Sequence, residues 1–323
     1  MDSSTYFPPL AHGSPMFTVL GVAVVFLIII FGLVGNFGIC AMVYTHRHLQ
    51  TIPNYLIVNL SVSDLLRIFF TLSVSAGVLI KRRWVFGDAF CHVNGSYTLV
   101  FLVASLMSVT LISVNRYFLI VRANESSTFF SLRRTKVMLS TLWFLAVFIA
   151  IPPILGWGHY GFFASRATCF IAVGSSYSYT SFLVITFITT PFSVLIWCYV
   201  TIYKAMKRSK NRVKCIRTLP VNISSENAER LKKEVNVAKT VLLLIGVYII
   251  TWIPICVIHF LRVARIGNIP DSVDLSAALL MSLSCVTNPW IYGFRHTQFR
   301  DQVRRLLCMK THMRDVEAQS SRQ

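Results

Sequence analysis

Two charged side chains interrupt stretches of sequence that are otherwise apolar, and both are candidates for chemistry. Arg116, in the tripeptide Asn115-Arg116-Tyr117, follows 27 consecutive residues without Asp, Glu, Lys or Arg. Asp64 lies in the run Leu60–Leu65 of another apolar stretch. An ionisable group in such surroundings is costly unless it faces a partner or a cavity. Each residue therefore marks a predicted functional site.

Other polar residues of the apolar stretches could complete a cation site. Asp64, Ser105, Ser284 and Asn288 offer the hard oxygen atoms that a small cation prefers. The alternative is a network of interhelical hydrogen bonds in which Asp64 is protonated. Pro289 follows Asn288 and lacks an N–H, so we expect neighbouring polar groups or water to satisfy the backbone carbonyl that it frees.

The elements that must position these residues follow from composition. The 323 residues are 55% hydrophobic and 13% charged, with a mean hydropathy of +0.63, whereas soluble domains carry about 25% charged residues. A membrane-crossing helix needs about 20 apolar residues. The stretches lack strand-like alternation, which favours helices over a barrel. We expect an all-α membrane protein, a seven-transmembrane helix bundle, with spans at Met16–Tyr44, Ile52–Ile80, Asp88–Ile120, Val137–Leu155, Ser176–Tyr203, Val237–Leu261 and Ser272–Phe294.

The distribution of basic residues predicts the orientation. Residues 1–15 hold no Lys or Arg, and most of the 31 Lys and Arg lie in the loops after the first, third and fifth spans and in the tail. This asymmetry places the N-terminus outside and the C-terminus in the cytoplasm. The net charge of +19 therefore indicates contact with anionic lipid, not nucleic acid. We expect no cleaved signal peptide, because residues 1–15 lack a basic and an apolar region.

The cysteines divide between the two sides of the membrane. On this topology Cys91 and Cys169 face the oxidising side, where a disulfide between them would tie the third span to the second outer loop. Two free surface thiols are the alternative. Cys308 follows an amphipathic stretch in the tail and is a candidate for palmitoylation.

Taken together, these residues resemble the rhodopsin-like (class A) G-protein-coupled receptors. The resemblance implies a receptor and not an enzyme, organised as an extracellular segment 1–15, a seven-helix domain 16–294, a membrane-surface helix 295–307 and a tail 308–323. The matching pieces are Gly35-Asn36, Leu60–Leu65 with Asp64, Cys91 with Cys169, Arg116-Tyr117, Trp143, Pro191 with Tyr199, Trp252 with Pro254, and Asn288–Tyr292.

The resemblance also implies a two-state switch. Glu234 would hold Arg116 in the inactive state. On activation the sixth helix would move outward, and Arg116 would contact Tyr199 and a heterotrimeric G protein. Arrestin and a receptor kinase are further implied partners. Trp252 would sense the ligand, and Asn288–Tyr292 would rearrange toward Tyr199.

Two details concern the inactive state. Asp64 with Ser105 would bind an allosteric sodium ion. Most of the family has an acidic residue before the arginine, and here it is Asn115. An amide cannot neutralise Arg116, so we expect either that Glu234 carries more of the restraint or that basal activity is raised.

The residues at several positions exclude particular classes of ligand. Amine receptors of this family carry an aspartate at the position of Thr98, so we do not expect a monoamine. Opsins bind retinal through a lysine of the seventh helix; Ser282 stands at that position, and we therefore expect no covalent cofactor. Asn115-Arg116-Tyr117 is similar to melatonin receptors, although Pro153 and Phe187 stand where those receptors have ligand-contacting residues.

We therefore expect a small non-amine ligand, with melatonin-like, lipid or peptide ligands as alternatives. Arg67, if it faces inward, and Arg262 could instead attract an anionic group. A transporter or channel is the rival class, against which no internal repeat is found, and a non-signalling decoy receptor is a third. The expected pocket is mostly apolar and comprises Thr98, Leu102, Leu183, Phe187, Trp252, Ile255, Cys256, His259 and Ser282.

Overall fold

The computed structural model describes residue 10 and residues 15–172, 175–218, 225–264 and 266–295, without the side chains of residues 15, 210, 212–235, 237 and 295. Most of the segment 1–15 lies outside the described residues. So do the predicted surface helix beyond Arg295 and the candidate lipidation site Cys308.

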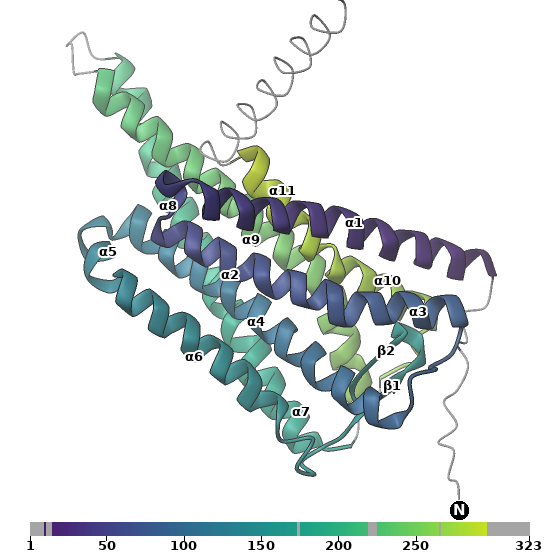
Figure 1. Ribbon diagram of the computed structural model, residues 1–323. Coiled ribbons are helices and arrows are strands. Elements are labelled where there is room, and N and C mark those ends of the chain that lie inside the picture. Colours follow the sequence, from purple (N-terminus) through teal and green to yellow (C-terminus); the bar gives the residue numbers. More distant parts are fainter. Residues whose placement is uncertain (1–9, 11–14, 173–174, 219–224, 265, 296–323) are drawn as a thin grey trace, which may run out of the picture.

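The described residues form an elongated helix bundle (Figure 1), which agrees with the predicted all-α class. Five spans are long and apolar enough to cross a membrane, namely Met16–Thr45, Ile52–Lys81, Asp88–Val121, Tyr177–Ser209 and Ala238–Val263. The other two predicted spans are also helical. The spans are α1 (Pro15–Thr45), α2 (Ile52–Arg67) with η2 (Ile68–Leu72) and α3 (Ser73–Lys81), α4 (Asp88–Val121), α6 (Leu132–Ala150), α7 (Tyr177–Leu183) with η4 (Val184–Thr189) and α8 (Thr190–Thr218), α9 (Ser225–Val263), and α10 (Asp271–Ser282) with α11 (Ser284–Arg295).

Two helices are longer than the apolar pattern predicted. α8 continues to Thr218 and α9 begins at Ser225, whereas the predicted spans ended at Tyr203 and began at Val237. The added segments are rich in Lys, Arg and Glu, which favour helix in water. Hydropathy marks where a helix leaves the membrane, and not where the helix itself ends.

α4 runs through the middle of the bundle and contacts α2, α6, α8 and α9. Small side chains on its buried face, such as Ala104, Ser105 and Ser108, let these neighbours approach closely. At one end of the bundle α4 leads into the short α5 (Ala123–Phe129), and η1 (Arg47–Leu49) joins α1 to α2. We call this the α5 end.

The opposite end carries a β-hairpin that the sequence did not predict (Figure 1). Strands β1 (Tyr160–Phe163) and β2 (Thr168–Ile171) pair antiparallel around η3 (Ala164–Arg166). The predicted disulfide between Cys91 and Cys169 is present, with the two Cα atoms 5.4 Å apart, and ties β2 to α4. The Tyr160 hydroxyl donates to the carbonyl of Ala150 at 2.8 Å and so fastens β1 to the end of α6. We call this the hairpin end.

The contact between α1 and α11 shows how the backbone carbonyl freed by Pro289 finds a hydrogen-bond donor. Pro289 cannot donate a backbone hydrogen bond, which frees the carbonyl of Cys285 one turn earlier. The Asn36 side-chain amide donates to that carbonyl at 2.8 Å. A Cβ atom at Gly35 would lie 2.8 Å from Cγ of Pro289, so only glycine permits this approach. The Gly35-Asn36 pair therefore fits the Pro289 kink both in shape and in hydrogen bonding.

We predict that Gly35→Ala lowers the melting temperature of the detergent-solubilised chain, because overpacking a tight contact costs about 1–3 kcal/mol. Gly38→Ala is the matched control on the same helix, since a Cβ atom there would meet nothing within 4 Å. Equal melting temperatures for the two variants would contradict this account of the α1–α11 contact.

Candidate ligand cavity and switch residues

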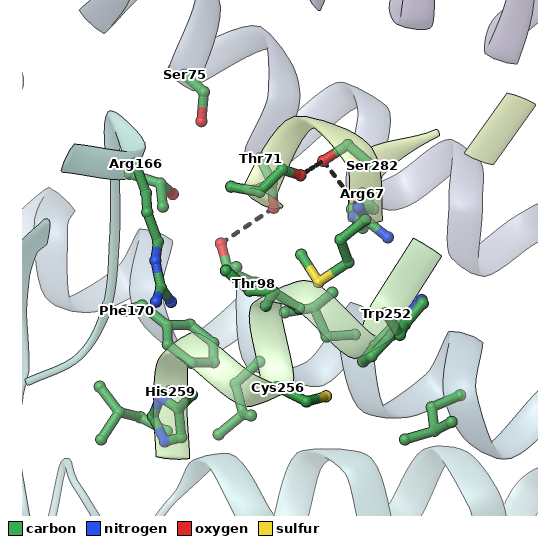
Figure 2. Close-up of a pocket in the computed structure, with 18 of the residues that line it drawn as sticks. Arg67, Thr71, Ser75, Thr98, Arg166, Phe170, Trp252, Cys256, His259 and Ser282 are labelled. Atoms are coloured by element: carbon green, nitrogen blue, oxygen red, sulfur yellow. Dashed lines mark hydrogen bonds between the residues drawn. The ribbon is translucent and has the colours of Figure 1, made fainter. Parts of the chain in front are cut away.

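A cavity of about 160 Å³ lies inside the bundle toward the hairpin end. Its wall is mostly apolar, and α4, α7, α9 and α10 contribute to it together with the hairpin (Figure 2). The structure brings all nine residues of the predicted pocket together around this cavity: Thr98, Leu102, Leu183, Phe187, Trp252, Ile255, Cys256, His259 and Ser282.

Several lining residues were not in the predicted pocket. Thr71 comes from the π-helical turn η2, and its hydroxyl lies 3.0 Å from that of Thr98. Arg166 and Phe170 come from the hairpin and line the cavity beside His259. The periodicity of apolar residues could not predict that the hairpin residues line the cavity, because they reach it only when the second outer loop folds back over the bundle.

Buried ion pairs lie at the hairpin end of the cavity, beside its lining residue Arg166. The Asp274 carboxylate is fully buried and accepts hydrogen bonds from Nε of Arg166 at 2.8 Å, Nη2 of Arg262 at 2.8 Å and Oγ of Ser165 at 2.6 Å. Burial lowers the pKa of the Arg166 guanidinium below its usual value, and the nearby Asp274 carboxylate offsets part of this shift. One carboxylate thus holds η3, α9 and α10 together. Arg262, predicted as a possible anion contact, is paired with Asp274.

Beneath the cavity lies the cluster around Asp64, which is fully buried. Oγ of Ser105 donates to Asp64 Oδ1 at 3.2 Å, and Nδ2 of Asn288 donates to Asp64 Oδ2 at 3.1 Å. The guanidinium of Arg67 donates to Oγ of Ser282 at 3.0 Å and is 3.4 Å from Oγ of Ser284. The four residues predicted to surround a cation are therefore gathered here, and Arg67 faces inward among them.

Aromatic packing connects the cavity to the bundle interior. Trp252 lines the cavity. The ring of Tyr248, which lies one turn earlier in α9, stacks on the Trp252 ring with centroids 5.1 Å apart. The same hydrophobic cluster contains Tyr292 of α11 and Tyr117 of α4. Packed side chains therefore run without interruption from the cavity to the α5 end.

Arg116 lies at the α5 end of α4 and is only 5% exposed. Its Nε atom has no hydrogen-bond partner within the described part of the chain, and its guanidinium interacts electrostatically with the buried Tyr292. The Asn115 side chain is buried, and its Oδ1 atom likewise lacks a partner there. Tyr292, and not a charged residue, is thus the neighbour of Arg116 that the structure describes.

The predicted alternative partners of Arg116 are placed differently. Glu234 belongs to α9, but its side chain lies outside the described residues. Tyr199 of α8 is 36% exposed and packs near Gly246 of α9. Tyr117, next to Arg116, packs against Trp197 of α8 with ring centroids 4.6 Å apart. Both interactions of Arg116 with Glu234 and Tyr199 stay predictions.

Comparison with known proteins agrees with this geometry. The family described as "7 transmembrane receptor (rhodopsin family)" matches residues 35–292. This chain belongs to that family. The receptor is therefore a membrane protein, and the seven helical spans are its transmembrane segments.

Similar proteins include opsins. The receptor is 26% identical over 290 residues to melanopsin-B of Xenopus laevis, covering 88% of this chain and 54% of the relative. It is 27% identical over 308 residues to a protein named Gq-coupled rhodopsin of Mizuhopecten yessoensis, covering 92% and 60%. The receptor spans about half the length of the first curated relatives it matches. Squid rhodopsin shares its fold, with a TM-score of 0.75 at 22% identity, covering 94% of this chain and 91% of the other.

The residues around Asp64 do not suit the sodium ion that the resemblance implied. Both oxygens of Asp64 already accept hydrogen bonds. Arg67 is 1% exposed and interacts electrostatically with Asp64. A sodium ion would add a second positive charge beside that guanidinium, and like charges repel strongly in an apolar interior. We therefore assign no role to sodium in the switch.

We predict that the melting temperature of the purified receptor is the same in sodium chloride and in choline chloride at equal ionic strength. Arg67→Leu removes the competing charge, so its melting temperature should become higher in sodium than in choline. Ser282→Ala keeps the guanidinium and is the control expected to stay insensitive. Stabilisation of the unaltered receptor by sodium would show that the charge argument is wrong.

Proposed function

We propose that this chain is a plasma-membrane receptor that binds a small, non-amine ligand in the cavity and activates heterotrimeric G proteins. The hairpin end would face the outside and the α5 end the cytoplasm, as the positive-inside rule predicts. The observation that best supports the proposal is the unbroken packing from Trp252 at the cavity to Tyr292 beside Arg116. A ligand at one end and a G protein at the other would bias the same two-state element.

The mechanism rests on α9. A ligand that contacts Trp252 would change the packing of this side chain against Tyr248. Pro254 lies one half-turn away inside the same helix and interrupts its hydrogen-bond ladder, so that segment can act as a hinge. Outward movement of the α5 end of α9 would then expose Arg116. The helix therefore converts a local contact at the cavity into a larger displacement at the G-protein face.

The neighbourhood of Arg116 supports a weakly restrained switch. A buried guanidinium that the described residues leave incompletely paired is costly, and a phenol compensates its charge less than a carboxylate does. Asn115 supplies no negative charge. Binding of a G protein, which would cover this end and offer acceptor groups, is therefore a favourable outcome for Arg116, and we propose a raised basal activity.

The residues of the cavity support the proposal that the ligand is diffusible and not covalently attached. Ser282 stands where opsins carry their retinal-bearing lysine, and the guanidinium of Arg67 donates a hydrogen bond to it. A fixed cation thus lies close to the place where an opsin would have its protonated Schiff base. Because one relative is named a Gq-coupled rhodopsin, a Gq-type protein is the first coupling partner to test. Arrestin and a receptor kinase remain proposed partners.

The decisive measurement is guanine-nucleotide exchange on a purified G protein by the receptor in lipid nanodiscs, without added ligand. We expect Arg116→Ala to reduce basal exchange to the level of empty nanodiscs. Arg83→Ala, which removes an exposed arginine near the hairpin end, should leave exchange unchanged. Ligand-independent ion flux with no nucleotide exchange would favour the transporter reading instead.

The Asn115→Asp variant tests the restraint itself. A carboxylate next to Arg116 supplies the missing negative charge, so basal exchange should fall several-fold while the expression and melting temperature stay near those of the unaltered receptor. An unchanged or higher basal rate would mean that the weak restraint of Arg116 does not originate at position 115.

A further inference from the structure

The cavity of the proposed receptor has an uneven charge distribution, which bears on its ligand. Two arginines, Arg67 and Arg166, lie on its wall, and no Asp or Glu is among the described lining residues. Arg67 has the buried Asp64 carboxylate close by. Arg166 must share Asp274 with Arg262. One positive charge is therefore left over at the hairpin end.

The unused hydrogen-bonding capacity lies at the same place. Arg166 is 8% exposed, and its Nε atom is the one that contacts Asp274. Its Nη2 atom is buried and has no partner within the described part of the chain. The side chain extends from the hairpin into the cavity beside Phe170 and His259 (Figure 2). An incompletely paired charged group is costly when buried, so the guanidinium favours an acceptor supplied from the cavity that it lines.

Among the described residues near Arg166, none competes for that role. The ring of Phe163 lies against the guanidinium, with Cζ of Arg166 5.4 Å from the ring centroid. This ring offers no strong hydrogen-bond acceptor. His259 interacts with both arginines and with Asp274, but it carries no negative charge. The groups that face Arg166 thus leave it electrostatically unbalanced.

The size and walls of the cavity limit the remainder of the ligand. A dry cavity of about 150 Å³ takes a molecule such as benzene, and this cavity is of about 160 Å³. The ligand is therefore small, on the order of ten non-hydrogen atoms. Phe170, Phe187 and Trp252 supply aromatic surface, which packs well against a flat apolar body.

We propose that the cavity binds a small aromatic carboxylate, whose anionic group pairs with the guanidinium of Arg166 and whose apolar body lies against Phe187 and Trp252. This inference rests on the proposed function and specifies its ligand. The ligand would then join the hairpin, through Arg166, to α9, through Trp252, which is the helix assigned to move.

The probe is 4-phenylbutyrate, compared with its neutral analogue 4-phenylbutan-1-ol. Equilibrium dialysis against phosphatidylcholine nanodiscs, with and without receptor, separates binding from partition into lipid. We expect the acid to bind at least about tenfold more tightly than the alcohol, because only the acid forms a charge-assisted pair. Arg166→Gln should weaken binding of the acid about tenfold and leave the alcohol unchanged.

Two controls keep the outcomes distinct. Arg83→Gln removes an exposed charge near the same end and should not alter binding of the acid. Arg166→Lys keeps the charge but not the guanidinium geometry, so its affinity for the acid should lie between those of the unaltered receptor and Arg166→Gln. Equal binding of acid and alcohol, or no receptor-dependent binding of the acid, would overturn the proposal even if a variant failed to fold.

The result can be separated from the receptor function. Basal nucleotide exchange and its loss in Arg116→Ala need no ligand. Normal exchange without a preference for the acid would reject only the anion site. Binding of the acid by a chain that never promotes exchange would reject the signalling function and retain the site.

Discussion

Polar groups in the apolar middle of this bundle must find their partners within the bundle, because neither lipid nor bulk water can satisfy them there. The consequence is visible at Pro289, where the freed carbonyl of Cys285 accepts from Asn36 of α1. It is visible again at Asp64, whose oxygens accept from α4 and α11. These directional contacts fix the relative rotation of the helices, which apolar packing alone leaves less well defined.

The same constraint explains why some features were predictable from sequence. A polar residue in an apolar stretch must face inward, so Asp64, Ser105 and Asn288 could be assigned to one cluster before their positions were known. The seven spans followed from hydropathy, and the nine predicted pocket residues surround one cavity. The disulfide between Cys91 and Cys169 was predictable because the topology leaves those two thiols on one side.

The residues that were missed belong to segments governed by other physics. The β1–β2 hairpin consists of eight strand residues, and its position depends on contacts of its strands with α4, and of η3 with α10, which lie far away in the sequence. Arg166 was therefore not among the residues of the predicted pocket. Arg67, by contrast, lies three residues after Asp64 and therefore on the same face of α2, so its position beside an inward-facing Asp64 followed from the spacing. The prediction of a sodium ion at Asp64 did not take the Arg67 guanidinium into account.

The position of Arg166 has a consequence for binding. Its Nε atom fastens the hairpin to Asp274, and its side chain lines the cavity. The hairpin is also held by the disulfide and by Tyr160, so this part of the wall is fixed at several points. A ligand that pairs with Arg166 would therefore meet a preformed surface, and little free energy would be lost in ordering it.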